Sequence, residues 1–180
     1  MSNAVLYIAT GPGSSDGFVP RISHAQVVEG ANSLVLDPMR SHKHSNNNSF
    51  ALAAFIQHAE RIVGAKSDPS ERVSVCCDSR YVVDGLTTWI KGWEQNGWMS
   101  KNHTPIKMKE QWQYARTLLR NLGGVLSYAR PEDELTIAYL LMLNTGASPS
   151  DLTAFEEREV TPIPPVPAKP RTLLPTQGLW

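Results

Sequence analysis

The first part of the chain changes from short apolar runs to a long amphipathic pattern. Residues 5–10 are a run of strand-forming residues that ends in a turn rich in glycine and proline. Two weaker strand candidates follow, at residues 18–28 and 32–37. From Ser49 onward apolar residues recur at helical spacing, and Asn48 or Ser49 is expected to cap this helix. The pattern therefore predicts three strands followed by a helix.

The second part repeats the alternation of strand and helix. Residues 73–77 are a compact apolar run typical of a buried strand, and helices are predicted over residues 80–90 and 105–122. A last strand is expected at residues 125–129. A final helix is predicted to begin at Pro131, with acidic residues in its first turn, where they suit the helix dipole. This order of elements indicates an α/β domain.

The composition changes again after the final helix, which divides the chain into a domain over residues 1–147 and a tail over residues 148–180. The tail holds a charged run followed by six prolines. Proline lacks an N–H donor and fixes φ, so we expect this tail to be disordered or bound to a partner. Its PPVPAK segment, residues 164–169, has the form of an SH3 ligand, although a plain linker is the favoured interpretation.

Charge and composition narrow the class of protein. Of 180 residues, 41% are hydrophobic and 19% charged, which is typical of a globular domain. The formal net charge is zero, so binding of nucleic acid would need a local basic patch. The sequence lacks an apolar run long enough to span a membrane and begins without a basic signal-peptide region. We therefore expect an intracellular protein, cytoplasmic or nuclear, that is not secreted and does not enter a membrane.

Four tryptophans give the most specific signal. Trp89, Trp93, Trp98 and Trp112 follow an Asp-Ser pair in the stretch CCDSRYVVDGLTTWIKGWEQNGWMSKNHTPIKMKEQW. This stretch resembles the central helix, basic handle and following helix of type 1 ribonuclease H. The resemblance implies the ribonuclease H-like fold, a mixed five-stranded sheet flanked by helices.

The same resemblance bears on catalysis. That family cleaves the RNA strand of RNA–DNA hybrids with two Mg²⁺ ions, which need carboxylate oxygens as ligands. The four carboxylate positions of the family fall on Gly11, Ala51, Asp78 and Ile137, and Asp78 alone is an acid. The resemblance therefore implies a catalytically inactive protein with a vestigial Asp78 and with no metal or other cofactor. Asp78 would then serve as a strand-end or helix-capping residue.

Two other functions stay open at this point. Asp16 and Glu134 are acids near lost ligand positions, so an active hybrid ribonuclease with rearranged ligands and Mg²⁺ is one alternative. The other is a purely structural scaffold protein that binds no nucleic acid.

The binding residues of the family are better matched. The resemblance implies that Asn47 and Asn48 contact the minor groove of a hybrid, although helix capping explains them equally well. In the handle, residues 90–111, the lysines are expected to meet phosphates and Trp93 to pack or to touch the nucleic acid. The lysines are Lys91, Lys101, Lys107 and Lys109.

A second basic cluster, at residues 40–44, is another possible phosphate patch, although a solvated loop is the commoner meaning. His42 and His44 lack a third ligand for a metal. The partners expected from these features are an RNA–DNA hybrid or double-stranded RNA, and a protein partner for the proline-rich tail.

Overall fold

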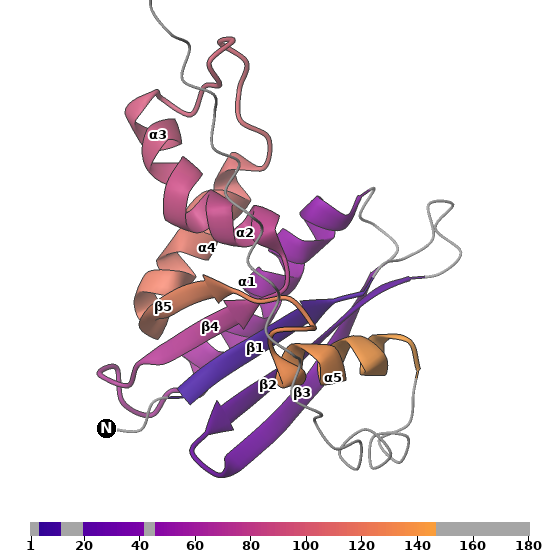
Figure 1. The fold of residues 1–180 in the computed structure, drawn as a ribbon. Coiled ribbons are helices and arrows are strands. Elements are labelled where there is room, and N and C mark those ends of the chain that lie inside the picture. Colours follow the sequence, from indigo (N-terminus) through magenta and orange to yellow (C-terminus); the bar gives the residue numbers. More distant parts are fainter. Residues whose placement is uncertain (1–3, 12–19, 42–45, 147–180) are drawn as a thin grey trace, which may run out of the picture.

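The structure is a computed structural model that describes residues 4–11, 20–41 and 46–146 (Figure 1). Its centre is a five-stranded sheet with the strand order β3-β2-β1-β4-β5. β1, β2 and β3 pair antiparallel, whereas β4 runs parallel to β1 and β5 runs parallel to β4. The mixed five-stranded sheet predicted from the sequence is therefore confirmed. The strands are β1 (Ala4–Thr10), β2 (Arg21–Glu29), β3 (Asn32–Ser41), β4 (Val73–Cys77) and β5 (Gly123–Tyr128).

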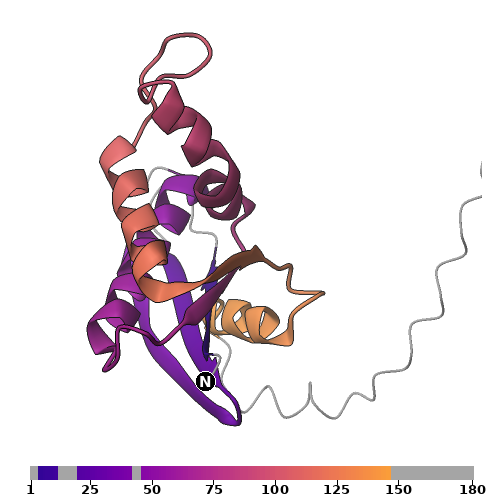
Figure 2. The same cartoon turned by 90° about the vertical axis from the view of Figure 1, so that its left-hand side faces the viewer.

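Helices cover both faces of this sheet. α1 and α4 pack against each other on one face, and α5 lies on the opposite face (Figure 2). A helix made of α2, the π turn η1 and α3 leads from the end of β4 into the handle (Figure 1). The helices are α1 (Asn47–Ala65), α2 (Arg80–Asp84), η1 (Gly85–Trp89), α3 (Ile90–Gln95), α4 (Lys109–Leu122) and α5 (Leu135–Asn144).

The central strand β1 shows how the sheet builds two cores. Leu6 and Ile8 are fully buried in the larger core under α1 and α4. Tyr7 and Ala9 belong to the smaller core under α5. Successive side chains of a strand point to opposite faces, so one apolar run supplies both cores. The same alternation carries Cys77 into the larger core and Cys76 into the smaller one.

The start of α1 differs from the sequence prediction. Asn46 is the N-cap, and its side-chain oxygen accepts a hydrogen bond from the Ser49 amide at 2.9 Å. The expected caps Asn48 and Ser49 are therefore wrong, because both already lie inside the first helical turn.

The helix predicted over residues 80–90 continues to Gln95, through the π turn at Gly85–Trp89. The helix predicted from Pro105 begins only at Lys109. Pro105 instead pairs with Met99 in an isolated β-bridge, and Met108 has a left-handed φ of 59°, which prevents the helix from extending further back.

The final helix also begins later than predicted. α5 starts at Leu135, and Glu134 is its N-cap, since the Glu134 carboxylate accepts from the Thr136 amide at 3.1 Å. The prediction of a start at Pro131 is wrong, because residues 131–133 form a turn in which Arg130 pairs with Glu132 and Asp133.

Several predictions lie outside the described residues. They concern the tail over residues 148–180, Asp16, and the cluster members His42, Lys43 and His44. Within the described ranges, none of the helices has the length and apolar character needed to cross a membrane.

Candidate functional site

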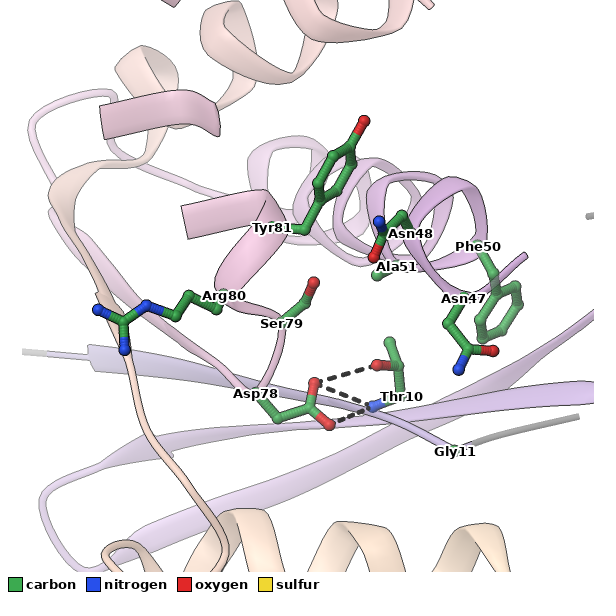
Figure 3. Close-up of a pocket in the computed structure, with 10 residues that line it drawn as sticks. All are labelled: Thr10, Gly11, Asn47, Asn48, Phe50, Ala51, Asp78, Ser79, Arg80 and Tyr81. Atoms are coloured by element: carbon green, nitrogen blue, oxygen red, sulfur yellow. Dashed lines mark hydrogen bonds between the residues drawn. The ribbon is translucent and has the colours of Figure 1, made fainter. Parts of the chain in front are cut away.

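A pocket of about 340 Å³ opens where β1 and β4 end beside the start of α1 (Figure 3). Three stretches of chain that are distant in sequence supply its walls: the end of β1, the first turns of α1, and the segment after β4. Its lining residues are Thr10, Gly11, Asn47, Asn48, Phe50, Ala51, Asp78, Ser79, Arg80 and Tyr81. Three of the four positions identified as family ligand positions, Gly11, Ala51 and Asp78, therefore meet at one pocket.

Asp78 is fixed by the neighbouring strand. Its amide donates to the Ile8 carbonyl at 3.2 Å, which extends the parallel pairing of β1 and β4 by one residue. Its carboxylate accepts from the Thr10 amide at 3.0 and 3.2 Å and from the Thr10 hydroxyl at 3.1 Å (Figure 3). Both carboxylate oxygens thus have partners from the protein itself.

The pKa of Asp78 is raised from 3.8 to about 6 because burial penalises the charged form. The hydrogen bonds from Thr10 oppose this rise, because they stabilise the carboxylate. Burial prevails. Asp78 therefore exchanges its proton closer to neutral pH than an ordinary aspartate does.

The pocket offers few ligands to a hard cation. Ala51 is buried with 3% of its surface exposed, and like Gly11 it brings no side-chain oxygen. Among the lining residues that the structure describes, Asp78 is the single carboxylate. Within the described ranges, no group of three or more His, Cys, Asp or Glu side chains is placed to hold a metal ion. A pair of Mg²⁺ ions requires several oxygen ligands in near-octahedral geometry, so the described lining residues do not by themselves fit it.

Ile137 lies apart from the other three positions. It is fully buried between α5 and the sheet, in the smaller core with Ala9, Cys76 and Leu140, and it does not line the pocket. The α5 residue that reaches Gly11 is Asn144. Glu134, considered above as a replacement ligand, caps α5 and does not line the pocket either.

The two asparagines expected to bind nucleic acid both line the pocket. Asn47 and Asn48 are exposed in the first turn of α1. The side-chain oxygen of Asn47 accepts from the Nε of Arg21 at 3.0 Å, and Arg21 itself is 8% exposed. Sequence reasoning missed Arg21, which stands in a weak strand pattern without any motif. This hydrogen bond joins the first residue of β2 to the first residue of α1 and so fixes the position of Asn47.

The tryptophans form one connected cluster with Tyr81. Neighbouring ring centroids lie 5.3–6.1 Å apart, running from Tyr81 and Trp89 through Trp93 to Trp98 and Trp112. Trp112 is fully buried and Trp98 is 8% exposed, whereas Trp89 is 38% exposed. Packing is therefore the main role of the cluster, and it joins the handle to the domain.

The handle exposes its positive charge. Lys91, Lys101, Lys107 and Lys109 are all exposed, and the Lys109 ammonium lies 5.9 Å from the centre of the Trp98 ring. The acid Glu94 forms an ion pair with Arg116 of α4. Because this partner lies outside the handle, Glu94 does not neutralise the handle lysines.

Comparison with known proteins finds sequence relatives of one family. The ribonuclease H family model matches residues 20–128. The ribonuclease H of a Bradyrhizobium species is 39% identical over 96 residues, which cover 51% of this chain and 59% of the relative. That of Hyphomonas neptunium is 40% identical over 68 residues, covering 38% and 42%. The chain spans about half the length of the curated relatives it matches.

Solved structures share the fold at low sequence identity. LC9-RNase H1 superposes with a TM-score of 0.60 and 22% identity, covering 79% of this chain and 71% of that one. LC11-RNase H1, solved in complex with an RNA/DNA hybrid, superposes with a TM-score of 0.53 and 15% identity, covering 77% and 93%.

Proposed function

Since this chain belongs to the ribonuclease H family, we propose that it binds an RNA–DNA hybrid or double-stranded RNA without cleaving it. The observation that carries the proposal is the composition of the pocket. Asn47 and Asn48, which we expect to face the nucleic acid, line the pocket together with one carboxylate, while Gly11 and Ala51 stand where further metal ligands would be needed.

The absence of cleavage follows from ligand chemistry. Two-metal hydrolysis needs both ions in place to activate the water and to stabilise the leaving oxygen. Asp78 alone cannot supply ligands for two ions, and both of its oxygens already accept hydrogen bonds from Thr10. Because its pKa is raised to about 6, Asp78 also holds a proton more readily than a normal metal-binding aspartate does, and a carboxylate must lose its proton to bind a metal. We therefore treat it as a structural residue that links β4 to β1.

Two sets of exposed polar side chains support binding. Asn47 and Asn48 present amides at the pocket, and amides can pair with the 2′-hydroxyls that distinguish RNA from DNA. The exposed lysines of the handle are suited to the phosphates of a duplex. One relative of the same fold, LC11-RNase H1, was solved with an RNA/DNA hybrid. A module that interacts only with protein partners is the rival that a binding assay eliminates.

The test combines binding and cleavage on the same labelled hybrid. Purified protein should retain the hybrid in a gel-shift or anisotropy assay, with affinity that falls as salt rises, and it should leave the strand intact in Mg²⁺ or Mn²⁺. A duplex of DNA alone serves as the control for 2′-hydroxyl recognition. Cleavage that disappears on Asp78→Asn would overturn the proposal in favour of an active nuclease. Absence of any salt-dependent binding would instead favour a scaffold protein.

A further inference from the structure

Gly11 stands in a place that leaves no room for a side chain. It is buried directly after β1, and its amide donates to the Ile22 carbonyl of β2 at 2.7 Å. A Cβ at this position would lie 2.8 Å from the Cβ of Asn144 and 3.2 Å from its Cγ. Real Cβ atoms essentially never approach another heavy atom that closely. The first atom of any side chain at position 11 would therefore collide with the end of α5.

Asn144 is held in that place by the sheet. Its amide lies 2.7 Å from the Nδ1 atom of His24 on β2, and its Nδ2 donates to the Ala9 carbonyl at 3.3 Å. Turning the amide by half a rotation keeps the contact with His24 and lets its oxygen accept from the Gly11 amide at 3.0 Å. In the first orientation the side chain joins β1 to β2, and in the turned one it joins Gly11 to β2. Asn144 cannot move away from Gly11 without losing these bonds.

We infer that Gly11 and Asn144 form a matched pair, the Gly11–Asn144 latch, that fastens the end of α5 to the sheet and closes position 11 to any side chain. The latch goes beyond the proposed function. It implies that position 11 cannot take a carboxylate unless Asn144, which is far away in the sequence, changes as well. An acid introduced at position 11 alone would meet Asn144 before it could approach Asp78. The latch also assigns Asn144 a structural role that the sequence pattern did not reveal.

A double-mutant cycle on thermal stability tests the latch. The single changes are Gly11→Ala and Asn144→Gly, the second of which removes the Cβ that a side chain at position 11 would strike. We expect Gly11→Ala to lower the Tm by roughly 5 °C in the natural background, as overpacking of a buried site does. The same change in the Asn144→Gly background should cost much less. The control is Gly64→Ala, which should not lower the Tm, because nothing lies within 4 Å of a Cβ at Gly64 and alanine favours the helix α1.

Two results would overturn the latch. The first is equal loss of Tm from Gly11→Ala in both backgrounds, because independent sites add. The second is absence of a nuclear Overhauser contact between the Hβ protons of Asn144 and the backbone protons of Gly11 in the natural protein, because the Cβ of Asn144 lies beside Gly11 in both amide orientations. Should Gly11→Ala fail to fold, comparison of Asn144→Gly with the double variant still decides: a small difference supports the latch, and a large one contradicts it.

The same double-mutant cycle with Gly11→Asp tests whether position 11 can hold an acidic side chain. We expect Gly11→Asp to fold less stably than the natural protein and to recover part of its Tm when Asn144 is changed to glycine. A Gly11→Asp variant as stable as the natural protein would show that position 11 is open. These measurements need no nucleic acid, so they stand or fall separately from the binding proposed above.

Discussion

Gly85 lies directly against the indole of Trp112. A Cβ at position 85 would be 2.3 Å from the Cη2 atom of that ring and 2.5 Å from Cζ3. Trp112 is fully buried and contacts both Tyr81 and Trp93, so the ring has neighbours on its other sides. The absence of a side chain at Gly85 is therefore what lets the π turn η1 approach α4.

Replacing Gly85 by alanine should destabilise the domain. A glycine-to-alanine change inside a helix normally gains up to about 1 kcal/mol. At Gly85 the overlap with Trp112 should outweigh that gain and give a net loss of about 1–3 kcal/mol in the free energy of unfolding. Urea unfolding followed by tryptophan fluorescence measures it. Gly92→Ala is the control, because nothing lies within 4 Å of its Cβ position. A Gly85→Ala variant as stable as Gly92→Ala would contradict this packing.

The order of strands and helices could be predicted because long regular patterns decide it. The apolar run of β1 and the helical spacing of α1 each involve many residues, so no single side chain can overturn them. The ends of the helices depend on single residues instead. Asn46, Met108 and Glu134 set three of those ends through one side-chain bond or one backbone angle. The pattern of apolar residues does not show where such single bonds or backbone angles end a helix.

The candidate site divides in the same way. Gly11 and Asp78 follow two neighbouring strands, and the ends of parallel neighbours necessarily meet at one edge of a sheet. Their shared pocket could therefore be inferred from the sequence. The identity of the α5 residue nearest Gly11 could not be inferred, because that identity depends on where α5 begins and how α5 packs. Counting from Pro131 indicated Ile137, whereas packing of the apolar face buries Ile137 and brings Asn144 to the sheet.

Two matched substitutions distinguish the role of α1 capping in stability from the role of α1 in binding the hybrid. Asn46→Ala removes the hydrogen bond to the Ser49 amide and should cost about 1 kcal/mol of stability. Asn48→Ala removes an exposed pocket amide that caps nothing, so it should leave stability nearly unchanged and weaken binding of the hybrid. Thermal unfolding and hybrid binding of both variants would show the contrast. Equal losses of stability would mean that the helix begins elsewhere.

Asp78 should make stability fall as pH rises. Its folded pKa of about 6 lies above the unfolded value of 3.8, so between these values the folded protein binds more protons than the unfolded chain. The free energy of unfolding should therefore decrease by about 1–3 kcal/mol from pH 4 to pH 6 on this account, and level off above. The difference between the natural protein and Asp78→Asn, measured by urea unfolding at each pH, isolates this contribution. A difference that does not vary with pH would contradict the raised pKa.

His58 acts in the opposite direction over nearly the same range. It is fully buried on α1, with Nε2 3.3 Å from the Ser23 hydroxyl, and burial together with the nearby Arg61 charge lowers its pKa from 6.5 to about 4. Between these values the unfolded chain binds more protons, so stability should fall by about 1–3 kcal/mol as pH drops from 6.5 to 4. His58→Gln keeps a partner for Ser23 and should remove this dependence. Because Asp78 offsets it in the natural protein, the test is best made in the Asp78→Asn background.

The handle lysines should strengthen binding of the hybrid by contacting its phosphates. Lys101→Glu with Lys107→Glu places two acids on the exposed handle, and it should weaken binding strongly at low salt. The slope of log affinity against log salt should fall by roughly 0.9 for each phosphate contact that is lost.

The matched control is Arg72→Glu with Arg120→Glu, which makes the same change of net charge at the opposite end of α4. If binding used only the overall charge, both pairs would weaken it equally. A handle that contacts phosphates predicts a large loss for the lysine pair, a small one for the arginine pair, and a reduced salt slope for the lysine pair alone. Fluorescence anisotropy with a labelled hybrid from 50 to 300 mM salt, about the range in which such contacts weaken, would decide between them.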